Sequence, residues 1–221
     1  MRTAFLTLSA ACAIKCILRA RSLSVINALC RRPLTVQFSR AGALDLKHCD
    51  TKNVVTDLVQ IKRYGEKGRE ENGRFRAWLK RHNFVERRLK AIAQEVEDEI
   101  DCTQCANCCR VATTQVNDRD IEHLARFLGM KVSDFLREYT QETAEEGRIL
   151  KRDENGCVFL VNNLCSVYEA RPHTCQFFPH LVKGNGSFVS RMWQMPDRAV
   201  YCPIVYNSLE LFKRETGFTK P

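Results

Sequence analysis

The sequence lacks the motifs by which several common enzyme classes are recognised. It contains no glycine-rich cofactor loop, no phosphate-binding P-loop, no G-x-S-x-G nucleophile motif and no H-E-x-x-H metalloprotease motif. It also has no internal repeat, which excludes a repeat array. The chain has 221 residues, 44% of them hydrophobic, which is enough for one domain with a hydrophobic core. We therefore expect a single domain.

Acidic residues are missing from the first 44 positions. This segment carries seven lysines and arginines and four serines among apolar residues, and the first acid is Asp45. A positive, amphipathic leader is typical of an organellar transit peptide, so we predict a transit peptide over residues 1–44 and a mitochondrial location, with a plastid as the alternative. A secretory signal is the competing interpretation, because Arg2 precedes a mostly apolar run from Ala4 to Ile14. Lys15 interrupts that run, which favours the transit peptide.

The sequence also lacks a long apolar run. The stretch from Ala4 to Ile14 falls short of the ~20 residues that span a bilayer, so we expect no membrane span. The formal net charge of +9 resembles that of nucleic-acid-binding proteins, but seven of the 35 basic residues lie in the leader. The other 28 face 26 acidic residues. The rest of the chain is therefore nearly neutral, so the net charge does not indicate a nucleic-acid partner.

Cysteine, in contrast, is abundant, with 12 residues. Three lie in the leader, and Cys49 follows His48 in a polar stretch, where we interpret the pair as surface residues rather than metal ligands. Eight remain, and half of them lie in the stretch "DCTQCANCCR". These eight are Cys102, Cys105, Cys108, Cys109, Cys157, Cys165, Cys175 and Cys202.

Metal binding explains this clustering better than disulfides do. Several bridges within eight positions would violate the Cα separations that disulfides require, and disulfide frameworks belong mainly to small secreted domains. In C-x2-C, by contrast, two thiolates converge on one ion. The run C-x2-C-x2-C wraps one face of a cubane iron–sulfur cluster whose fourth ligand commonly comes from a distant Cys-Pro, here Cys202-Pro203. The first predicted site is Cys102, Cys105, Cys108 and Cys202.

The adjacent pair Cys108-Cys109 suggests a second site. Neighbouring side chains in extended backbone face opposite directions, so we expect Cys109 to join Cys157, Cys165 and Cys175. Two sets of four match the demand of structural zinc or of a cubane cluster. Spacing does not assign the ligands individually, and His173 or His180, which flank Cys175, could replace a thiolate. Either an iron–sulfur cluster or zinc fits, and the three-cysteine run favours the cluster.

These cysteine motifs resemble a known family, the CxxCxxCC zinc- or iron-chelating proteins, whose pattern also occurs in flagellin lysine methylases. The resemblance covers about Cys102 to Cys202 and rests on "CTQCANCC", "GCVFLVNNLCSVYEARPHTCQFFP" and the downstream Cys202. The family element C-S-x-Y-x-x-R-P-x-x-C-x-x-F-P is matched in full. Gln176 and Val158 depart from a basic residue and a proline that are frequent there. The resemblance implies metal chelation by the eight cysteines, with an undefined biological role.

Three functions remain open at this stage. The first is a metal-binding protein, holding iron–sulfur and/or zinc, whose protein partner is unknown. The second is a cluster-dependent enzyme similar to a protein-lysine methylase, although Cys102, Cys105 and Cys108 do not fit the C-x3-C-x2-C spacing of radical S-adenosylmethionine enzymes. The third is a zinc-stabilised nucleic-acid-binding module. Its DNA-contacting helix would carry acidic residues such as Asp134 and Glu138, which would repel phosphate groups and so disfavour this function. No catalytic residue can be named.

The hydrophobic pattern predicts an α+β fold. Apolar residues recur at threes and fours from Phe75 to Ile100, which predicts a long amphipathic helix leading to Cys102. A helical hairpin should follow Asn117, with Gly129 at its turn. Two β-hairpins are predicted at the Asn155-Gly156 and Asn185-Gly186 turns. The cysteine-rich metal centre should lie between the helices and these hairpins.

Two boundaries complete the predicted organisation. Residues 45–74 are polar and contain three glycines, so we interpret them as a linker or a loosely packed approach. Residues 75–221 should form one cysteine-cluster metal-binding domain. The acids that end the long helix, Glu95 to Asp101, are interpreted as a solvated face rather than as ligands.

Overall fold

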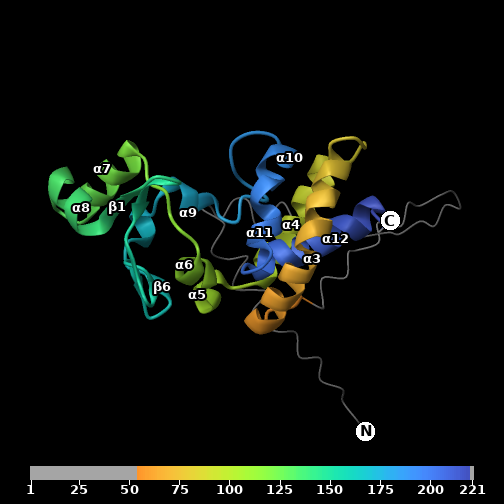
Figure 1. The fold of residues 1–221 in the computed structure, drawn as a ribbon, viewed down its shortest axis with the longest axis horizontal. Coiled ribbons are helices and arrows are strands. Elements are labelled where there is room, and N and C mark those ends of the chain that lie inside the picture. Colours follow the sequence, from red (N-terminus) through yellow and green to blue (C-terminus); the bar gives the residue numbers. More distant parts are fainter. Residues whose placement is uncertain (1–53, 220–221) are drawn as a thin grey trace, which may run out of the picture. The chain divides into compact units, whose positions relative to one another are not determined.

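The computed structural model describes residues 54–219 and has an α+β fold, as predicted (Figure 1). The transit peptide over residues 1–44, its three cysteines and the His48-Cys49 pair lie outside the described residues. In chain order, the α-helices are α3 (Leu58–Leu79), α4 (Glu86–Glu99), α5 (Cys102–Cys105), α6 (Asn107–Val111), α7 (Asp118–Phe127), α8 (Val132–Tyr139), α9 (His173–Phe177), α10 (Phe188–Arg191), α11 (Met195–Arg198) and α12 (Pro203–Thr216).

The strands lie between α8 and α9 and form three antiparallel pairs. They are β1 (Thr140–Thr143), β2 (Gly147–Leu150), β3 (Arg152–Asp153), β4 (Gly156–Cys157), β5 (Leu160–Val161) and β6 (Leu164–Cys165), paired β1–β2, β3–β4 and β5–β6. Short 3-10 turns occupy Tyr168–Ala170 and Met192–Gln194. Strands this short contribute little stability by themselves, so packing and side-chain contacts must hold this region.

The larger hydrophobic core lies among the helices α3, α4 and α12, which come from opposite ends of the described chain (Figure 1). Phe75 and Leu79 of α3 pack there with Leu89 of α4 and Phe212 of α12, all nearly inaccessible to water. The core also takes in the buried Cys202 at the start of α12. One of the predicted metal ligands is therefore anchored directly in the helical core.

The predicted linker is wrong from residue 58 onward, because α3 occupies that segment. The Asp57 side chain caps the helix by accepting a hydrogen bond from the Gln60 amide at 2.8 Å. Ile61 is fully buried although the surrounding sequence is polar. The glycines that suggested a loop are tolerated because tertiary packing overrides their low helix propensity.

Gly65 has a specific reason to lack a side chain. A Cβ at this position would lie 2.5 Å from the carbonyl oxygen of Ala199 and 2.6 Å from the Cα of Val200. α3 therefore approaches the backbone after α11 more closely than any other residue would allow. A glycine that the sequence pattern reads as a break is here a packing contact between two helical segments.

Two glycines of α3 make a matched test of this contact. We expect Gly65→Ala to destabilise the protein by about 3 kcal/mol, because the new methyl group meets backbone atoms that cannot turn away. Gly73→Ala, on an exposed position with nothing within 4 Å of the added Cβ, should stabilise the helix by about 0.5–1 kcal/mol. Urea unfolding followed by circular dichroism measures both. Equal effects of the two substitutions would show that Gly65 is not a contact.

The long helix predicted from Phe75 to Ile100 is also wrong, because the segment forms two helices. α3 ends at Leu79 and α4 begins at Glu86, with Val85 in an extended conformation before it. The apolar periodicity continues across the break because both helices face the same core. Periodicity therefore identified the buried face correctly and missed the turn.

A second hydrophobic core lies under the helical hairpin of α7 and α8, which is present as predicted. Asn117 begins α7 with a capping box, in which Asn117 and Asp120 bond reciprocally to each other's backbone amides. Leu124 and Phe135 pack in this core with Leu150 and Phe159 from the strand region. The hairpin thus supports the strands that carry two of the cysteines.

Of the two predicted hairpins, one is present in the structure. The turn at Asn155-Gly156 joins β3 and β4, with Asp153 opposite Gly156. The hairpin predicted at Asn185-Gly186 does not form, because Ser187 caps the helix α10 instead. β1–β2 and β5–β6 were not predicted. β5–β6 turns through Asn162 and Asn163, whose φ angles of 49° and 66° match the turns that asparagine tolerates.

No helix within residues 54–219 combines the length and the apolar character needed to cross a membrane.

Candidate metal centre

All eight predicted ligand cysteines lie in the described part of the chain, and all have free thiols. Cys202 is buried, Cys102 is exposed and the other six are intermediate. Within residues 54–219, no three histidine, cysteine, aspartate or glutamate side chains are arranged so that they could hold a metal ion. The question is therefore which thiols the fold brings into one neighbourhood.

The segment "DCTQCANCC" folds into two short helices that change direction at Ala106. Asp101 begins α5 by accepting a hydrogen bond from the Thr103 amide at 2.9 Å. Ala106 is buried and left-handed, with φ of 46°, which ends α5 and starts α6. At this reversal the Asn107 side chain donates a hydrogen bond to the carbonyl oxygen of Tyr201 at 2.8 Å. That bond ties the first cysteine cluster to the residue before Cys202.

Cys202 shares an electrostatic neighbourhood with the first three cysteines. Burial raises the pKa of its thiol to about 12, and negative charge on Cys102 and Cys105 raises it further. The amides of Val205 and Ile204 oppose this shift, because Cys202 sits at the N-terminus of α12. The thiol of Cys108 is affected by two of the same cysteines, Cys202 and Cys102. Its pKa is raised mainly by the Cys109 thiol and by burial, and also by Cys202 and Cys102.

A second neighbourhood forms where α6 meets β4. A Cβ on Gly156 would lie only 2.6 Å from the carbonyl oxygen of Cys109, so the two backbones touch next to Cys157. The Arg152 side chain reinforces this contact by donating hydrogen bonds to the carbonyl oxygens of Arg110 and Ala112. Cys109 and Cys157 are thereby brought together from positions 48 residues apart.

Cys165 and Cys175 belong to this second neighbourhood. Burial raises the pKa of Cys175 to about 12, the Thr114 hydroxyl group opposes this, and the charges of Cys109, Cys157 and Cys165 add to it. Thr114 Oγ1 lies 3.8 Å from Cys175 Sγ. Burial likewise raises the pKa of Cys165, with Cys109 contributing. The thiols thus gather around Cys109.

The argument that separated Cys108 from Cys109 rested on extended backbone, and that premise is wrong. Both residues lie in α6, where successive side chains diverge by about 100°. Their thiols still meet, because a hydrogen bond from Cys108 is the largest cause that lowers the pKa of Cys109, to about 7. Arg110 and Arg152 lower it further. The two thiols nonetheless have different partners beyond each other.

Several polar residues near the thiols were not predicted. Arg152 and Thr114 carry no motif signal, since they reach the site through β-pairing and a loop. Glu97 was counted among solvated acids, yet burial raises its pKa to about 7, with Lys183 opposing, and its charge raises the pKa of Cys102. The only sequence signal was an acid near a helix C-terminus, where the dipole disfavours it. Arg110 donates a hydrogen bond to the Cys105 carbonyl oxygen at 2.9 Å.

The two histidines have other surroundings. His173 is exposed, and its backbone amide donates to Asp120 at 3.0 Å. Burial is the main cause that lowers the pKa of His180 to about 4, and the positive charges of Arg198, His173 and Arg191 contribute. His180 therefore stays neutral at pH 7, among cations rather than thiolates. Whether either histidine replaces a cysteine ligand stays a prediction.

The lowered pKa of His180 implies a defined pH dependence. The folded protein releases the His180 proton near pH 4, whereas the unfolded chain does so near 6.5. As pH falls from 6.5 to 4, the unfolded state binds more protons, so stability decreases. We expect His180→Asn, which tolerates the φ of 68°, to reduce this loss by about 1 kcal/mol after allowance for partial exposure. Urea unfolding at pH 7 and pH 4.5 measures it. An equal loss of stability between pH 7 and pH 4.5 in the wild type and in His180→Asn would show that His180 does not cause this pH dependence.

Comparison with known proteins agrees with the cysteine motifs. Residues 101–203 match the CxxCxxCC family, described as "Putative zinc- or iron-chelating domain". The resemblance inferred from the motifs is thus confirmed. An uncharacterized protein of Methanocaldococcus jannaschii is 34% identical over 97 residues, which cover 39% of this chain and 32% of that protein. The chain therefore spans about a third of that relative's length. No solved structure matches.

Proposed function

Because residues 101–203 match a zinc- or iron-chelating domain, we propose that this protein binds metal through two sets of four cysteines. The first set is Cys102, Cys105, Cys108 and Cys202. The second set is Cys109, Cys157, Cys165 and Cys175. The observation that carries this proposal is that Cys202 and Cys102 raise the pKa of Cys108, whereas Cys109, Cys157 and Cys165 raise that of Cys175; Cys109 also raises the pKa of Cys102 and so lies close to both groups.

Backbone contacts support the same division independently of charge. The hydrogen bond from Asn107 to the Tyr201 carbonyl oxygen places Cys108 near Cys202. The contact of Gly156 with the Cys109 backbone places Cys109 near Cys157. These two contacts involve different elements, so each set has its own anchor in the fold.

The donor chemistry fits a metal held by thiolates. The buried thiols of Cys175 and Cys202 resist ionisation, and a metal ion would supply the positive charge that their thiolate forms need. The side chains do not form a finished site, which is expected when metal binding and local folding are coupled. We therefore propose that the thiolates draw together when metal binds.

The two sets differ in the metal that they favour. In the first set, the spacing C-x2-C-x2-C and the distant Cys202-Pro203 favour an iron–sulfur cluster, which would supply one-electron transfer. In the second set, the ligands come from α6, β4, β6 and α9, and four thiolates satisfy either structural zinc or a second cluster. Cys202 lies in the helical core, so a metal in the first set would join that core to the cysteine segment.

Elemental analysis of anaerobically purified protein tests the proposal. Iron with matching acid-labile sulfide and a visible absorption band would support a cluster in the first set. Colourless protein with about two zinc ions per chain would support two structural sites instead. Protein that contains neither metal, and that binds neither after reduction of its thiols, would overturn the proposal.

We further propose that the protein acts in mitochondria and that its partner is another protein. The basic leader with no acid before Asp45 supports the location. The near balance of basic and acidic residues after the leader argues against nucleic acid. Imaging of the full chain fused at its C-terminus to a fluorescent protein tests the location, and a plastid or secretory pattern would contradict it.

A further inference from the structure

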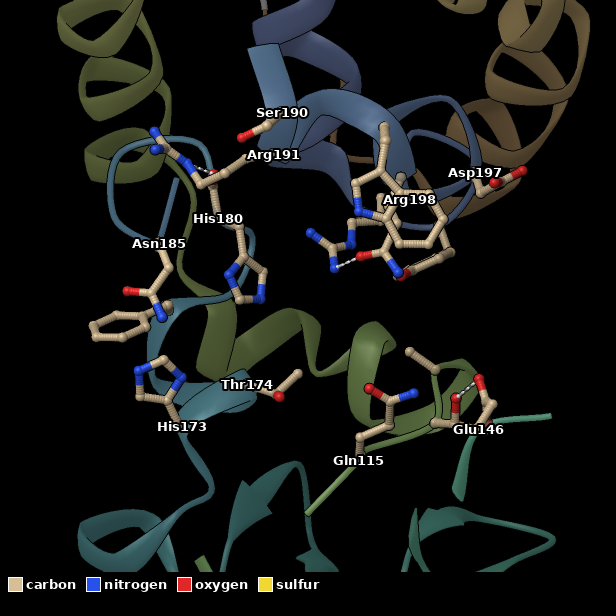
Figure 2. Close-up of a pocket in the computed structure, with 16 residues that line it drawn as sticks. Gln115, Glu146, His173, Thr174, His180, Asn185, Ser190, Arg191, Asp197 and Arg198 are labelled. Carbon is tan, nitrogen blue, oxygen red and sulfur yellow. Dashed lines mark hydrogen bonds between the residues drawn. The ribbon is translucent and has the colours of Figure 1, made fainter. Parts of the chain in front are cut away.

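An open cavity of about 780 Å³ lies beside the first cysteine set without including any of the eight cysteines in its lining (Figure 2). Its walls come from the segment after α6, from the β1–β2 turn at Glu146, from α9 and the residues that follow it, and from α10 to Tyr201. A volume of this size accommodates a small organic molecule rather than a single inorganic ion. The polar side chains in the walls indicate what kind of molecule it is.

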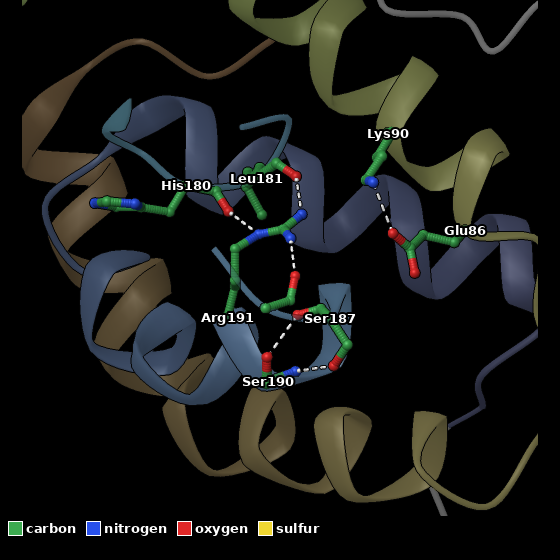
Figure 3. Close-up of polar contacts among 8 residues, drawn as sticks. Glu86, Lys90, His180, Leu181, Ser187, Ser190 and Arg191 are labelled. Atoms are coloured by element: carbon green, nitrogen blue, oxygen red, sulfur yellow. Dashed lines mark hydrogen bonds and ion pairs between the residues drawn. The ribbon is translucent and has the colours of Figure 1, made fainter. Parts of the chain in front are cut away.

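One of the two arginines in the walls is fully engaged in holding the fold. Arg191 donates hydrogen bonds to the carbonyl oxygens of His180 at 3.0 Å, Gly186 at 2.7 Å and Leu181 at 3.2 Å (Figure 3). These bonds close the loop that was predicted to be a hairpin. Arg191 therefore shapes the cavity and has few donors left for a ligand.

Arg198, like Arg191, makes no ion pair within residues 54–219, but fewer of its donors are engaged in holding the fold. Its guanidinium group donates to the Pro179 carbonyl oxygen at 3.3 Å and to the Gln194 side chain, which are both neutral. Within residues 54–219, no carboxylate lies within ion-pair distance of it. Burial lowers the pKa of the half-buried Arg198, and Tyr201 and Cys202 oppose this shift; an anion in the cavity would add a further negative partner.

The acidic residues of the lining do not supply that partner. Asp197 pairs with Arg69 at 3.4 Å, outside the cavity, and is largely exposed. Glu146 accepts a hydrogen bond from the Thr113 hydroxyl group at 2.7 Å on the opposite wall. Neither carboxylate is paired with Arg198 or with Arg191.

His180 provides a second unpartnered group in the same walls. Its Nε2 atom is inaccessible to water and has no hydrogen-bond partner. The residue is held at a φ of 68°, and its carbonyl group is fixed by Arg191, so the position of the ring is set by the backbone. Figure 2 shows the ring projecting toward Thr174 and His173 on the cavity wall. A buried polar atom without a partner is costly unless a ligand or water satisfies it.

We propose that this cavity binds a small organic anion, whose carboxylate or phosphate group contacts Arg198 and His180. Trp193, which lines the cavity and is 61% exposed, offers a flat apolar surface for the uncharged body of the ligand. No cysteine lines the cavity, although Arg198 lies within electrostatic reach of Cys202.

Calorimetric titration of the full-length, metal-loaded protein tests this site. The probes are adenosine monophosphate, adenosine, succinate and inorganic phosphate, at low ionic strength because salt screens a half-exposed charge. We expect adenosine monophosphate to bind, and neutral adenosine to bind about 10-fold or more weakly. Succinate binding as tightly as adenosine monophosphate would assign a carboxylate ligand. Inorganic phosphate should bind more weakly than adenosine monophosphate or succinate, since it lacks the organic part of the ligand.

Variants locate the binding. Arg198→Met should weaken binding of adenosine monophosphate about 10- to 100-fold, and Arg198→Lys should recover part of it. Arg126→Met, which removes an exposed arginine from α7, is the matched control and should bind normally. If Arg198→Met does not fold, His180→Asn decides, with an expected loss of about 5- to 10-fold.

Three outcomes would overturn the proposal. They are no saturable heat with any of the three anions at millimolar concentration, equal binding by Arg198→Met and wild type, and equal losses in Arg198→Met and Arg126→Met. Metal content is measured on the same samples. A protein that holds its metal but binds no anion refutes the cavity alone, whereas anion binding by protein that takes up neither iron nor zinc after reduction supports the cavity and refutes the metal proposal.

Discussion

Replacing Cys108 by serine is expected to remove the metal of one centre, whereas replacing its neighbour Cys109 should remove the metal of the other. The reason is that Cys108 shares its surroundings with Cys202, and Cys109 shares its surroundings with Cys157 and Cys175. Each variant should lose about half of the bound metal. Each should also lose about 5 kcal/mol or more of folding free energy, since a structural metal contributes on the order of 10 kcal/mol. Metal analysis and urea unfolding of both variants measure these losses.

Double variants sharpen this prediction. Cys108→Ser combined with Cys202→Ser should lose hardly more metal than either alone, because one centre is already gone. Cys108→Ser combined with Cys175→Ser should lose nearly all of it, because the two residues serve different centres. Cys49→Ser, which changes a cysteine outside both sets, is the control. Loss of the same metal from Cys108→Ser and Cys109→Ser would contradict the division.

Removal of the metal should unfold the cysteine segment and leave the main helices in place. The strand pairs β3–β4 and β5–β6 have two residues on each side, too few to persist without support. The helices α3, α4 and α12 instead share a core of large apolar side chains, including Phe75, Leu89 and Phe212. We therefore expect lost amide protection in the segments that carry the cysteines, about residues 102–112 and 152–177, and retained protection in these three helices.

Hydrogen exchange with mass spectrometry measures this loss before and after treatment with a chelator, with an oxidant added when the metal is an iron–sulfur cluster. Peptides from α7 and α8 serve as the internal comparison, because their apolar core contacts both helices and strands. They should show intermediate protection. Unchanged exchange throughout residues 102–112 and 152–177 would show that the fold does not depend on metal.

Local sequence signals were sufficient wherever a short segment determines its own structure. The capping residue Asn117 and the periodicity of α7 and α8 predicted a hairpin that the structure contains. The Asn155-Gly156 turn is equally local. Most of the apolar positions from Phe75 to Ile100 were identified correctly as facing the core, although Val85, between α3 and α4, is 68% exposed.

The errors arose where a distant segment decides the outcome. Gly65 looked like a loop residue, and its role becomes visible only when the backbone at Ala199 lies against it. Asn185-Gly186 looked like a hairpin turn, but Arg191 satisfies the carbonyl groups that a partner strand would otherwise have to bond. Neither contact leaves a trace in local composition.

The sequence by itself predicted metal chelation, because its cysteine spacings match those of a zinc- or iron-chelating domain family. It also determined the α+β class through its periodicity. Only the tertiary structure decided which thiols become neighbours, since Asn107 meeting Tyr201 and Cys109 meeting Gly156 are contacts between residues 94 and 47 positions apart. The cavity at Arg198 is also a product of the tertiary structure. Its walls come from four segments, including the β1–β2 turn at Glu146, so their juxtaposition exists only in the folded chain.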